Sequence, residues 1–170
     1  MARKPSLSLG TTNSGGRANH TGNRLEEFVE HALQDSGYVE FCGNKALAFA
    51  NLNALGGRQY FKQLVVGPTI YDTRRICDFM VINDELFPAH LIIECKWQQS
   101  TGSVDEKYPF LVLNLIKTGI PTVVLLDGGG YKPAAMHWLK AQVNPASALV
   151  GVWNMSEFQK RVNNGFFDHP

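Results

Sequence analysis

The first part of the chain changes from a polar stretch without a pattern to a helical spacing of apolar residues. Residues 1–21 are rich in Gly, Ser, Thr and Asn and lack apolar periodicity, which predicts a flexible arm. Residues 24–34 place apolar side chains at the i, i+3, i+4 and i+7 positions of an amphipathic helix. Asn23 is positioned to cap this helix, and Gly37 is positioned to end it.

A series of strand-like segments follows the first helix. Short apolar runs bounded by turn residues predict strands over residues 60–66, 75–82, 91–97, 122–126 and 149–153. The second and third of these runs flank the turn residues Asn83 and Asp84, which predicts an antiparallel hairpin. Residues 38–41 favour a short strand, and residues 45–55 fit either a helix or a loop.

Helical spacing returns in three later segments. Residues 103–117 begin with a capping-box pattern, Ser103 and Glu106, and residues 134–142 form the second segment. The third segment contains Phe158 and Val162, and we expect Ser156 to cap it. The order of helix, strands, helix, strand and helix predicts an α/β layered domain with a mixed sheet.

Length and composition limit the classes of protein to consider. At 170 residues the chain is long enough for one domain with a hydrophobic core, which we expect over residues 22–170. No apolar run approaches about 18 residues, so we expect no membrane span. The start of the chain lacks the apolar segment of a secretion signal, and three cysteines without CxxC spacing indicate reduced, buried thiols. These features predict a cytoplasmic protein.

The net charge of +1 conceals an asymmetry. Residues 1–24 carry four basic side chains and no acidic one, whereas the remainder has 12 basic and 15 acidic side chains. Basic patches are common in nucleic-acid-binding proteins, so two interpretations of the arm remain open, a DNA contact and a solvated tail. The basic residues that we consider as DNA contacts are Arg17, Arg24, Arg58, Arg74 and Arg75, and the aromatic ones are Tyr60 and Tyr71.

Polar residues interrupt the two central strand-like runs. Asp78 lies within the first run, and Glu94, Lys96 and Gln98 lie two residues apart in and after the second, so these three share one face. Burying charged groups is costly unless they have a partner or a task. Mg²⁺ bound by carboxylates can activate water and neutralise a phosphate, and a nearby lysine can orient the water. Asp78, Glu94 and Lys96 provide these groups, and the backbone carbonyl of Cys95 is placed to complete the metal shell.

Helix geometry selects one of three acidic residues on the first helix. Glu26 lies at the edge of the apolar stripe, Glu27 points nearly opposite, and Glu30 is further from the stripe than Glu26. Glu26 is therefore best placed to reach a site on the surface that the helix packs against. A role for Glu26 in capping the helix is the alternative.

The spacing of these residues resembles a known family. Asp78, followed sixteen residues later by Glu94-Cys95-Lys96, resembles the PD-(D/E)xK nuclease superfamily, which has the restriction-endonuclease-like fold. Gly22 to Glu26 resembles the Gly-x-x-x-Glu pattern of that family's first helix. Two stretches, residues 98–107 and 127–130, resemble type II restriction endonucleases in particular. The resemblance covers roughly residues 22–153, and Cys77 stands where many members have proline.

The resemblance implies a fold, a metal and roles for the site residues. The implied fold is an αβββαβ core with a central mixed sheet flanked by helices. Asp78 and Glu94 would bind Mg²⁺, which Mn²⁺ can replace, and Lys96 would act on the attacking water. Glu26 would bind or orient a second metal ion or its water, and Gln98 would contact the metal-bound water or the scissile phosphate. No organic cofactor is implied.

Three functions are compatible with these residues. The first is a type II restriction endonuclease that cuts double-stranded DNA at a specific site, as a homodimer so that both strands are cut. The second is a structure-specific nuclease that cuts junctions or flaps. The third is a DNA-binding protein on the same fold that has lost hydrolysis. The three glycines at 128–130 lack the GK[ST] ending of a phosphate loop, so we interpret them as a turn.

Overall fold

The computed structural model describes residues 14–99 and 105–168, with the side chains of the first helix described from Arg24 onward. Six strands form one sheet in the order of the chain. The strands are β1 (Val39–Glu40), β2 (Gln59–Pro68), β3 (Arg74–Asn83), β4 (Phe87–Trp97), β5 (Thr122–Asp127) and β6 (Leu149–Trp153). The helices are α1 (Ser14–Asp35), α2 (Lys45–Ala50), α3 (Tyr108–Thr118), α4 (Pro133–Ala141) and α5 (Met155–Asn163). Three 3₁₀ turns are η1 (Leu52–Ala54), η2 (Asp105–Lys107) and η3 (Pro145–Ser147).

The sheet is mixed, and the direction of its strands follows from their connections. β2, β3 and β4 are antiparallel neighbours, and a short turn joins β3 to β4 as expected for a hairpin. β4, β5 and β6 are parallel, and α3 and α4 provide the crossovers that parallel strands require. The α/β class with a mixed sheet is therefore confirmed.

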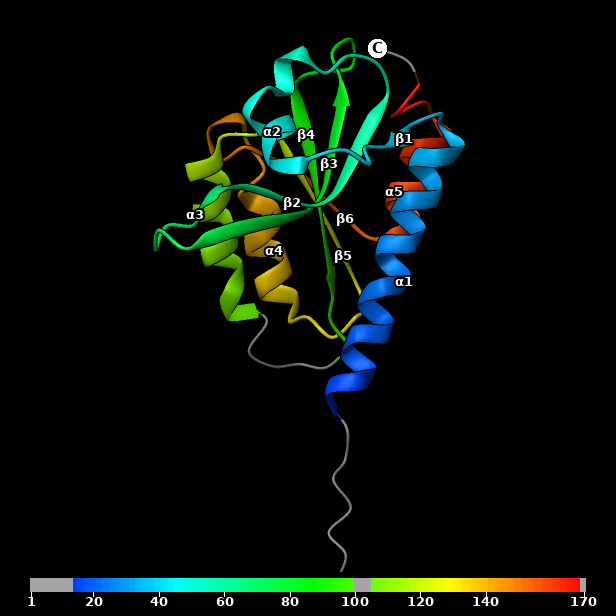
Figure 1. Ribbon diagram of the computed structural model, residues 1–170. Helices are drawn as coiled ribbons and strands as arrows, with labels where there is room; N and C mark the ends of the chain where they lie inside the picture. The colour runs from blue at the N-terminus through cyan, green and yellow to red at the C-terminus, as the bar shows by residue number, and fades with distance from the viewer. Residues whose placement is uncertain (1–13, 100–104, 169–170) are drawn as a thin grey trace, which may run out of the picture.

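Helices cover both faces of the sheet (Figure 1). α1 and α5 lie on one face, where their apolar side chains pack against Phe79, Ile93 and Val123. α3 and α4 lie on the other face and pack against Val124 and Leu126. α2 covers the β2–β3 part of that second face. Because β5 is covered on both sides, its apolar residues are all buried, as the unbroken apolar run predicts.

The boundaries of two helices differ from the sequence expectation. α1 begins at Ser14, ten residues before the expected start, so residues 14–21 are helical where the sequence predicted an arm without secondary structure. Its first turns project beyond the sheet (Figure 1), so they need no apolar stripe, and the periodicity marks only the part that packs. Asn154, not Ser156, caps α5, and its side chain forms a capping box with Glu157. Residues 1–13 and Ser103 lie outside the described residues.

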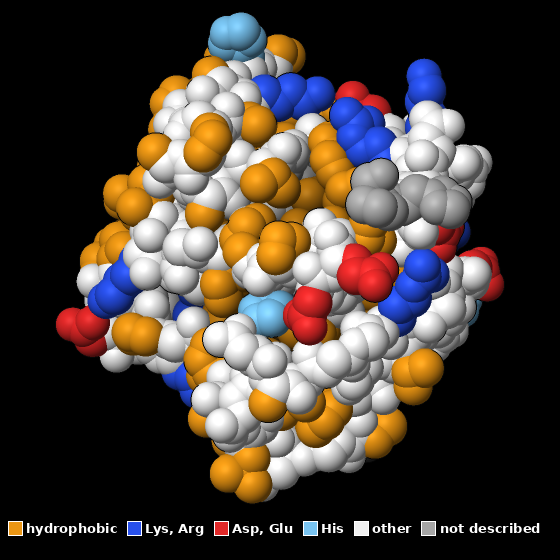
Figure 2. Space-filling view, turned by 90° about the horizontal axis from the view of Figure 1, so that it is seen from above, with side chains coloured by type: hydrophobic (Ala, Val, Ile, Leu, Met, Phe, Trp, Pro, Cys, Tyr) orange, Lys and Arg blue, Asp and Glu red, His pale blue; other side chains and the backbone are white. Residues whose placement is uncertain are grey.

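The end of the molecule above the β3–β4 turn carries a mixed surface. Seen from above (Figure 2), acidic, basic and hydrophobic side chains are intermingled there, and the described Lys and Arg side chains lie in separate places. The described surface at this end therefore shows no basic patch of the kind that marks a nucleic-acid interface.

All three cysteines are free, although Cys42 is exposed and not buried as expected. Within the described ranges, no helix combines the length and hydropathy needed to cross a membrane.

Candidate active site

The candidate site forms where β3 and β4 separate. Phe79 on β3 is paired with Ile93 on β4. Asp78 precedes Phe79, and its carboxylate accepts a hydrogen bond from the backbone N–H of Cys95 on β4 at 2.7 Å. In an extended strand the N–H and C=O of one residue point to the same neighbouring strand. The carbonyl of Cys95 therefore also points to the side where Asp78 lies.

Lys96 bridges the two carboxylates that the sequence places on neighbouring strands. Its Nζ lies 2.8 Å from Glu94 Oε2 and 3.3 Å from Asp78 Oδ2. Burial disfavours the ammonium ion, but the charges of Glu94 and Asp78 outweigh burial and raise the pKa of Lys96. Glu94, Asp78 and Lys96 therefore form one charged cluster, whose lysine side chain remains 35% exposed.

Arg75 holds the other oxygen of Glu94. Its guanidinium donates to Glu94 Oε1 at 3.0 Å, to the hydroxyl of Thr118 and to the carbonyl of Asn114. Arg75 is only 6% exposed and Glu94 only 4%. The expectation that Arg75 is an exposed DNA contact is therefore corrected, because its guanidinium is buried and already bound to Glu94, Thr118 and Asn114.

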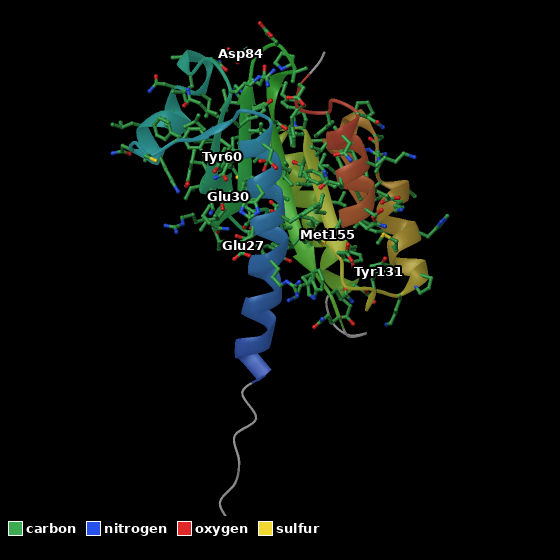
Figure 3. The ribbon with its side chains drawn as sticks, turned by 90° about the vertical axis from the view of Figure 1, so that its right-hand side faces the viewer. Glu27, Glu30, Tyr60, Asp84, Tyr131 and Met155 are labelled. Atoms are coloured by element: carbon green, nitrogen blue, oxygen red, sulfur yellow. The ribbon has the colours of Figure 1, made fainter. Side chains whose placement is uncertain are left out.

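Glu26 and Glu30 on α1 have different surroundings. Glu30 accepts hydrogen bonds from Tyr60 at 3.0 Å and Lys62 at 2.6 Å, and Figure 3 shows Glu30 and Tyr60 close together between α1 and β2. Burial opposes the charged form of Glu30, but these hydrogen bonds outweigh it and lower its pKa. Glu30 therefore has a structural ion pair, and Tyr60 is fully buried and does not face DNA.

Glu26 lies near enough to the cluster to interact with it. Burial raises the pKa of Glu26, and the charge of Asp78 raises it further, while Lys62, Lys96 and a hydrogen bond with Gln63 act in the opposite direction. A partly buried carboxylate whose pKa is raised further by a neighbouring carboxylate is a candidate for a functional site, because a bound cation would favour its charged form.

A family model described as a PD-(D/E)XK nuclease superfamily domain matches residues 17–166. The chain belongs to the PD-(D/E)XK nuclease superfamily. No curated protein and no solved structure matches the chain. Members of this superfamily generally use divalent metal ions, so the arrangement of the oxygen ligands has a direct bearing on function.

The residues of this nuclease domain fit a divalent cation held by oxygen ligands. Asp78 Oδ2 and Glu94 Oε2 both approach a single cation, the Lys96 ammonium, so both oxygens already face one position. The Cys95 carbonyl is directed to the same side of β4. Among the described residues no group of three or more His, Cys, Asp or Glu side chains is placed to hold a metal. The fit is therefore to two carboxylates and a backbone carbonyl, a set that suits Mg²⁺.

Gln98 is buried beside the site and fully engaged. It is 2% exposed, its amide nitrogen donates to Asp105 and to the carbonyl of Gly130, and its amide oxygen accepts from Tyr108. The structure thus places Gln98 at a junction of β4, α3 and the loop after β5. These hydrogen bonds hold the end of β4, and the expected contact of Gln98 with a phosphate or a metal-bound water stays a prediction.

The three glycines after β5 form a turn, as the sequence suggests. Gly128 has a φ of +100°, and a Cβ on it would lie 2.4 Å from the carbonyl oxygen of Gln98. Glycine is therefore required at this position for the loop to approach β4. The approach is completed by a hydrogen bond from the Gly130 N–H to the same carbonyl at 2.8 Å.

The other described arginines that were expected to contact DNA do not form one surface around the site. Arg74 is exposed next to the site. Arg58 donates to Asp168 and to the carbonyl of Ser36, so the structure places it in a contact with the end of the chain and not on a surface beside the carboxylates. Arg24 is exposed on α1, and the side chain of Arg17 lies outside the described set.

One residue at the site was missed by sequence reasoning. Gln63 has a positive φ of 51° and donates to Asp78 Oδ1 at 3.4 Å, directly across the β2–β3 pair. A positive φ in a non-glycine residue costs of the order of 1–3 kcal/mol and is concentrated at functional sites. The available signal was a break in the apolar alternation of β2 at Lys62 and Gln63.

Proposed function

We propose that the protein is a Mg²⁺-dependent DNA endonuclease that hydrolyses phosphodiester bonds. The observation that carries the proposal is the convergence of the Asp78 and Glu94 carboxylates on one cation, which in this structure is the Lys96 ammonium. When bound, the metal ion supplies a Lewis acid and an activated water. Mn²⁺ is the expected substitute.

The residues of the chain have distinct roles in this proposal. Asp78, Glu94 and the Cys95 carbonyl hold the metal. The raised pKa of Lys96 keeps its amine charged in the metal-free protein, which favours charge neutralisation and orientation of the phosphate over proton abstraction. Glu26 faces the same cluster and assists in binding the metal or its water.

The proposal predicts that cleavage depends on these side chains and on the metal. The wild-type protein should convert DNA to shorter products with Mg²⁺ and not with EDTA. Asp78→Asn and Lys96→Ala should each lower the cleavage rate by about 100-fold or more, the effect typical of losing one preorganised electrostatic contact. Agarose gels and end mapping on mixed-sequence DNA provide the measurement.

Matched variants control for nonspecific effects. Asp84 is exposed in the β3–β4 turn and Lys160 is exposed on α5, so Asp84→Asn and Lys160→Ala should cleave as the wild type does. Circular dichroism should show that all variants are folded. Undiminished cleavage by Asp78→Asn, or no cleavage by the wild type with any divalent metal, would falsify the proposal. The second outcome, with DNA binding retained, would instead support a DNA-binding protein that has lost hydrolysis.

End mapping also separates two forms of the proposal. Discrete ends within plain duplexes support site-specific restriction, for which a homodimer would provide one active site for each strand. Cuts confined to flaps or four-way junctions support a structure-specific nuclease. A groove beside the carboxylates, lined by both cationic and aromatic side chains, favours this second form.

A further inference from the structure

A groove lies beside the carboxylates, between the β2–β3 hairpin and the beginning of α3. Its volume is about 320 Å³, at the lower end of the range of roughly 300–1,000 Å³ for small-molecule sites. Glu94 and Lys96 form part of its lining, so a group in the groove lies directly next to the proposed scissile bond. Such a volume suits one nucleotide unit and excludes a base-paired duplex.

The groove is electropositive. Arg74 and Lys107 line it from the exposed ends of β3 and η2, and Lys96 and Arg75 line its inner part. Among the described lining residues Glu94 is the acidic one, and its two oxygens are already paired with Arg75 and Lys96. The unpaired positive charge therefore favours an anionic ligand such as a phosphate.

One wall of the groove is apolar and aromatic. Phe110 and Ile76 line it, and Ile76 is 39% exposed. Tyr71, which is 72% exposed, stacks on Phe110 with ring centroids 5.2 Å apart and an interplanar angle of 24°. Flat aromatic surfaces next to cationic side chains are the elements with which proteins bind single-stranded nucleic acid.

The two walls are fastened to each other. The N–H of Ile70 in the hairpin donates to the side chain of Asn114 on α3 at 2.8 Å. Lys117 on the same helix donates to the carbonyl of Thr69 at 2.8 Å and pairs with Asp72 at 2.7 Å. The groove is therefore formed before any ligand binds, which lowers the entropic cost of binding.

We propose that this groove binds one unpaired nucleotide of the DNA strand next to the scissile phosphate. Arg74 and Lys107 contact the adjoining phosphate, and the base lies against Phe110, which Tyr71 supports. The inference rests on the proposed nuclease function and specifies its substrate as a strand with a nucleotide out of the duplex stack at the cut.

A binding experiment without cleavage tests this inference. The probe is a fluorescent 12-nucleotide thymidine single strand, titrated with the full chain in Ca²⁺ at several salt concentrations. Arg74→Ala and Lys107→Ala should each lower the slope of log affinity against log salt by about 0.7, the value for one phosphate contact on a single strand. Phe110→Ala should weaken binding by about fivefold or more, because it removes a stacking surface.

Two variants outside the groove provide the controls. Lys160→Ala removes an exposed cation from α5, and Leu113→Ala removes a side chain that is 48% exposed on α3 but does not line the groove. Both should bind the probe within twofold of the wild type. A fully paired duplex of the same length should bind more weakly than the single strand and be insensitive to Phe110→Ala.

The outcomes separate this inference from the nuclease proposal. Unchanged probe binding by Arg74→Ala, Lys107→Ala and Phe110→Ala overturns the groove, even if Mg²⁺-dependent cleavage is intact. Equal binding of the duplex, with equal losses in the variants, overturns the assignment to an unpaired nucleotide. The expected losses in a protein that cleaves nothing would support the groove and contradict the nuclease. Thermal unfolding shows which variants are folded, and Phe110→Leu replaces Phe110→Ala if the latter is not.

Discussion

The two oxygens of the Glu94 carboxylate are held by cations of different character. Arg75 binds Oε1 from a buried position, whereas Lys96 binds Oε2 from a position that solvent reaches. A buried arginine that also donates to Asn114 and Thr118 has a fixed geometry. Arg75 therefore fixes the carboxylate so that Oε2 faces the cation position.

This arrangement predicts that Arg75 acts on metal affinity through Glu94. Arg75→Met should raise the dissociation constant for Mn²⁺ by about tenfold or more, the usual effect of removing a partner of a metal ligand. It should also lower the free energy of unfolding by about 3 kcal/mol, because it breaks a buried ion pair. Isothermal titration calorimetry and urea denaturation measure the two quantities.

The neighbouring arginine provides the matched control. Arg74 is exposed and has no contact with Glu94 among the described interactions, so Arg74→Met should leave Mn²⁺ affinity unchanged. Arg75→Lys should recover part of the Mn²⁺ affinity, since lysine restores the positive charge but not the planar guanidinium with its several donors. Equal Mn²⁺ affinity in Arg75→Met and the wild type would refute the positioning role.

The sequence predicted that Asp78, Glu94 and Lys96 lie together, as they do in the structure, but it did not predict all of their partners. Glu94 and Lys96 were assigned to one face because strand periodicity determines the face directly. The role of Arg75 was not predictable, since its partners Asn114 and Thr118 lie on α3, 39 and 43 residues away in the sequence. Gln98 shows the same limit, because alternation placed it on the correct face but could not show that α3 and the loop after β5 would cover it.

At the scale of elements, α1 is joined to the sheet by two acids with opposite effects on stability. Glu30 has a lowered pKa, so its charge stabilises the folded protein above the unfolded value near 4.5. That contribution is lost as the pH falls through the lower folded value. Glu26 has a raised pKa, so its charge destabilises the metal-free fold at neutral pH, and this cost disappears at acidic pH.

Replacing each of these glutamates by glutamine should therefore change the free energy of unfolding in opposite directions. At pH 7 without metal, Glu30→Gln should lower the free energy of unfolding by about 1 kcal/mol, because the ion pair with Lys62 is lost. Glu26→Gln should raise it slightly while reducing cleavage. Both differences should shrink when urea denaturation is repeated below pH 4.5. Destabilisation by Glu26→Gln at pH 7 would contradict the assignment of Glu26 to the site.

Helix ends were less predictable than helix cores. The stripe of α1 marked Leu25 to Leu33 because these residues pack on the sheet, whereas the projecting turns before Arg24 leave no hydrophobic pattern. Asn154 and Ser156 are both suitable caps by type. The choice of Asn154 depends on the chain direction after β6, where Asp127 accepts the N–H of Met155 at 2.8 Å.

At the scale of the whole molecule, acidic side chains gather at the candidate site, whereas the net charge of the protein is small. The net charge of the chain is only +1. The face in Figure 2 has intermingled charges, whereas Asp78, Glu94 and Glu26 converge on one cluster. In the metal-free protein the charges of Glu26 and Asp78 oppose each other. The proposed metal ion would relieve this repulsion in the folded state, so its binding should stabilise the fold.

This coupling of metal binding to folding predicts that a metal ion stabilises the fold without any catalysis. Ca²⁺ at 100 times its dissociation constant should add about 2.7 kcal/mol, which corresponds to a rise of about 5–10 °C in the unfolding temperature of a domain of this size. Asp78→Asn should lose most of that rise, because it removes a ligand, and Asp84→Asn should retain it. Differential scanning fluorimetry provides the measurement. A full Ca²⁺-dependent rise in Asp78→Asn would locate the metal elsewhere, because the ion would then bind without the carboxylate on which the proposed site depends.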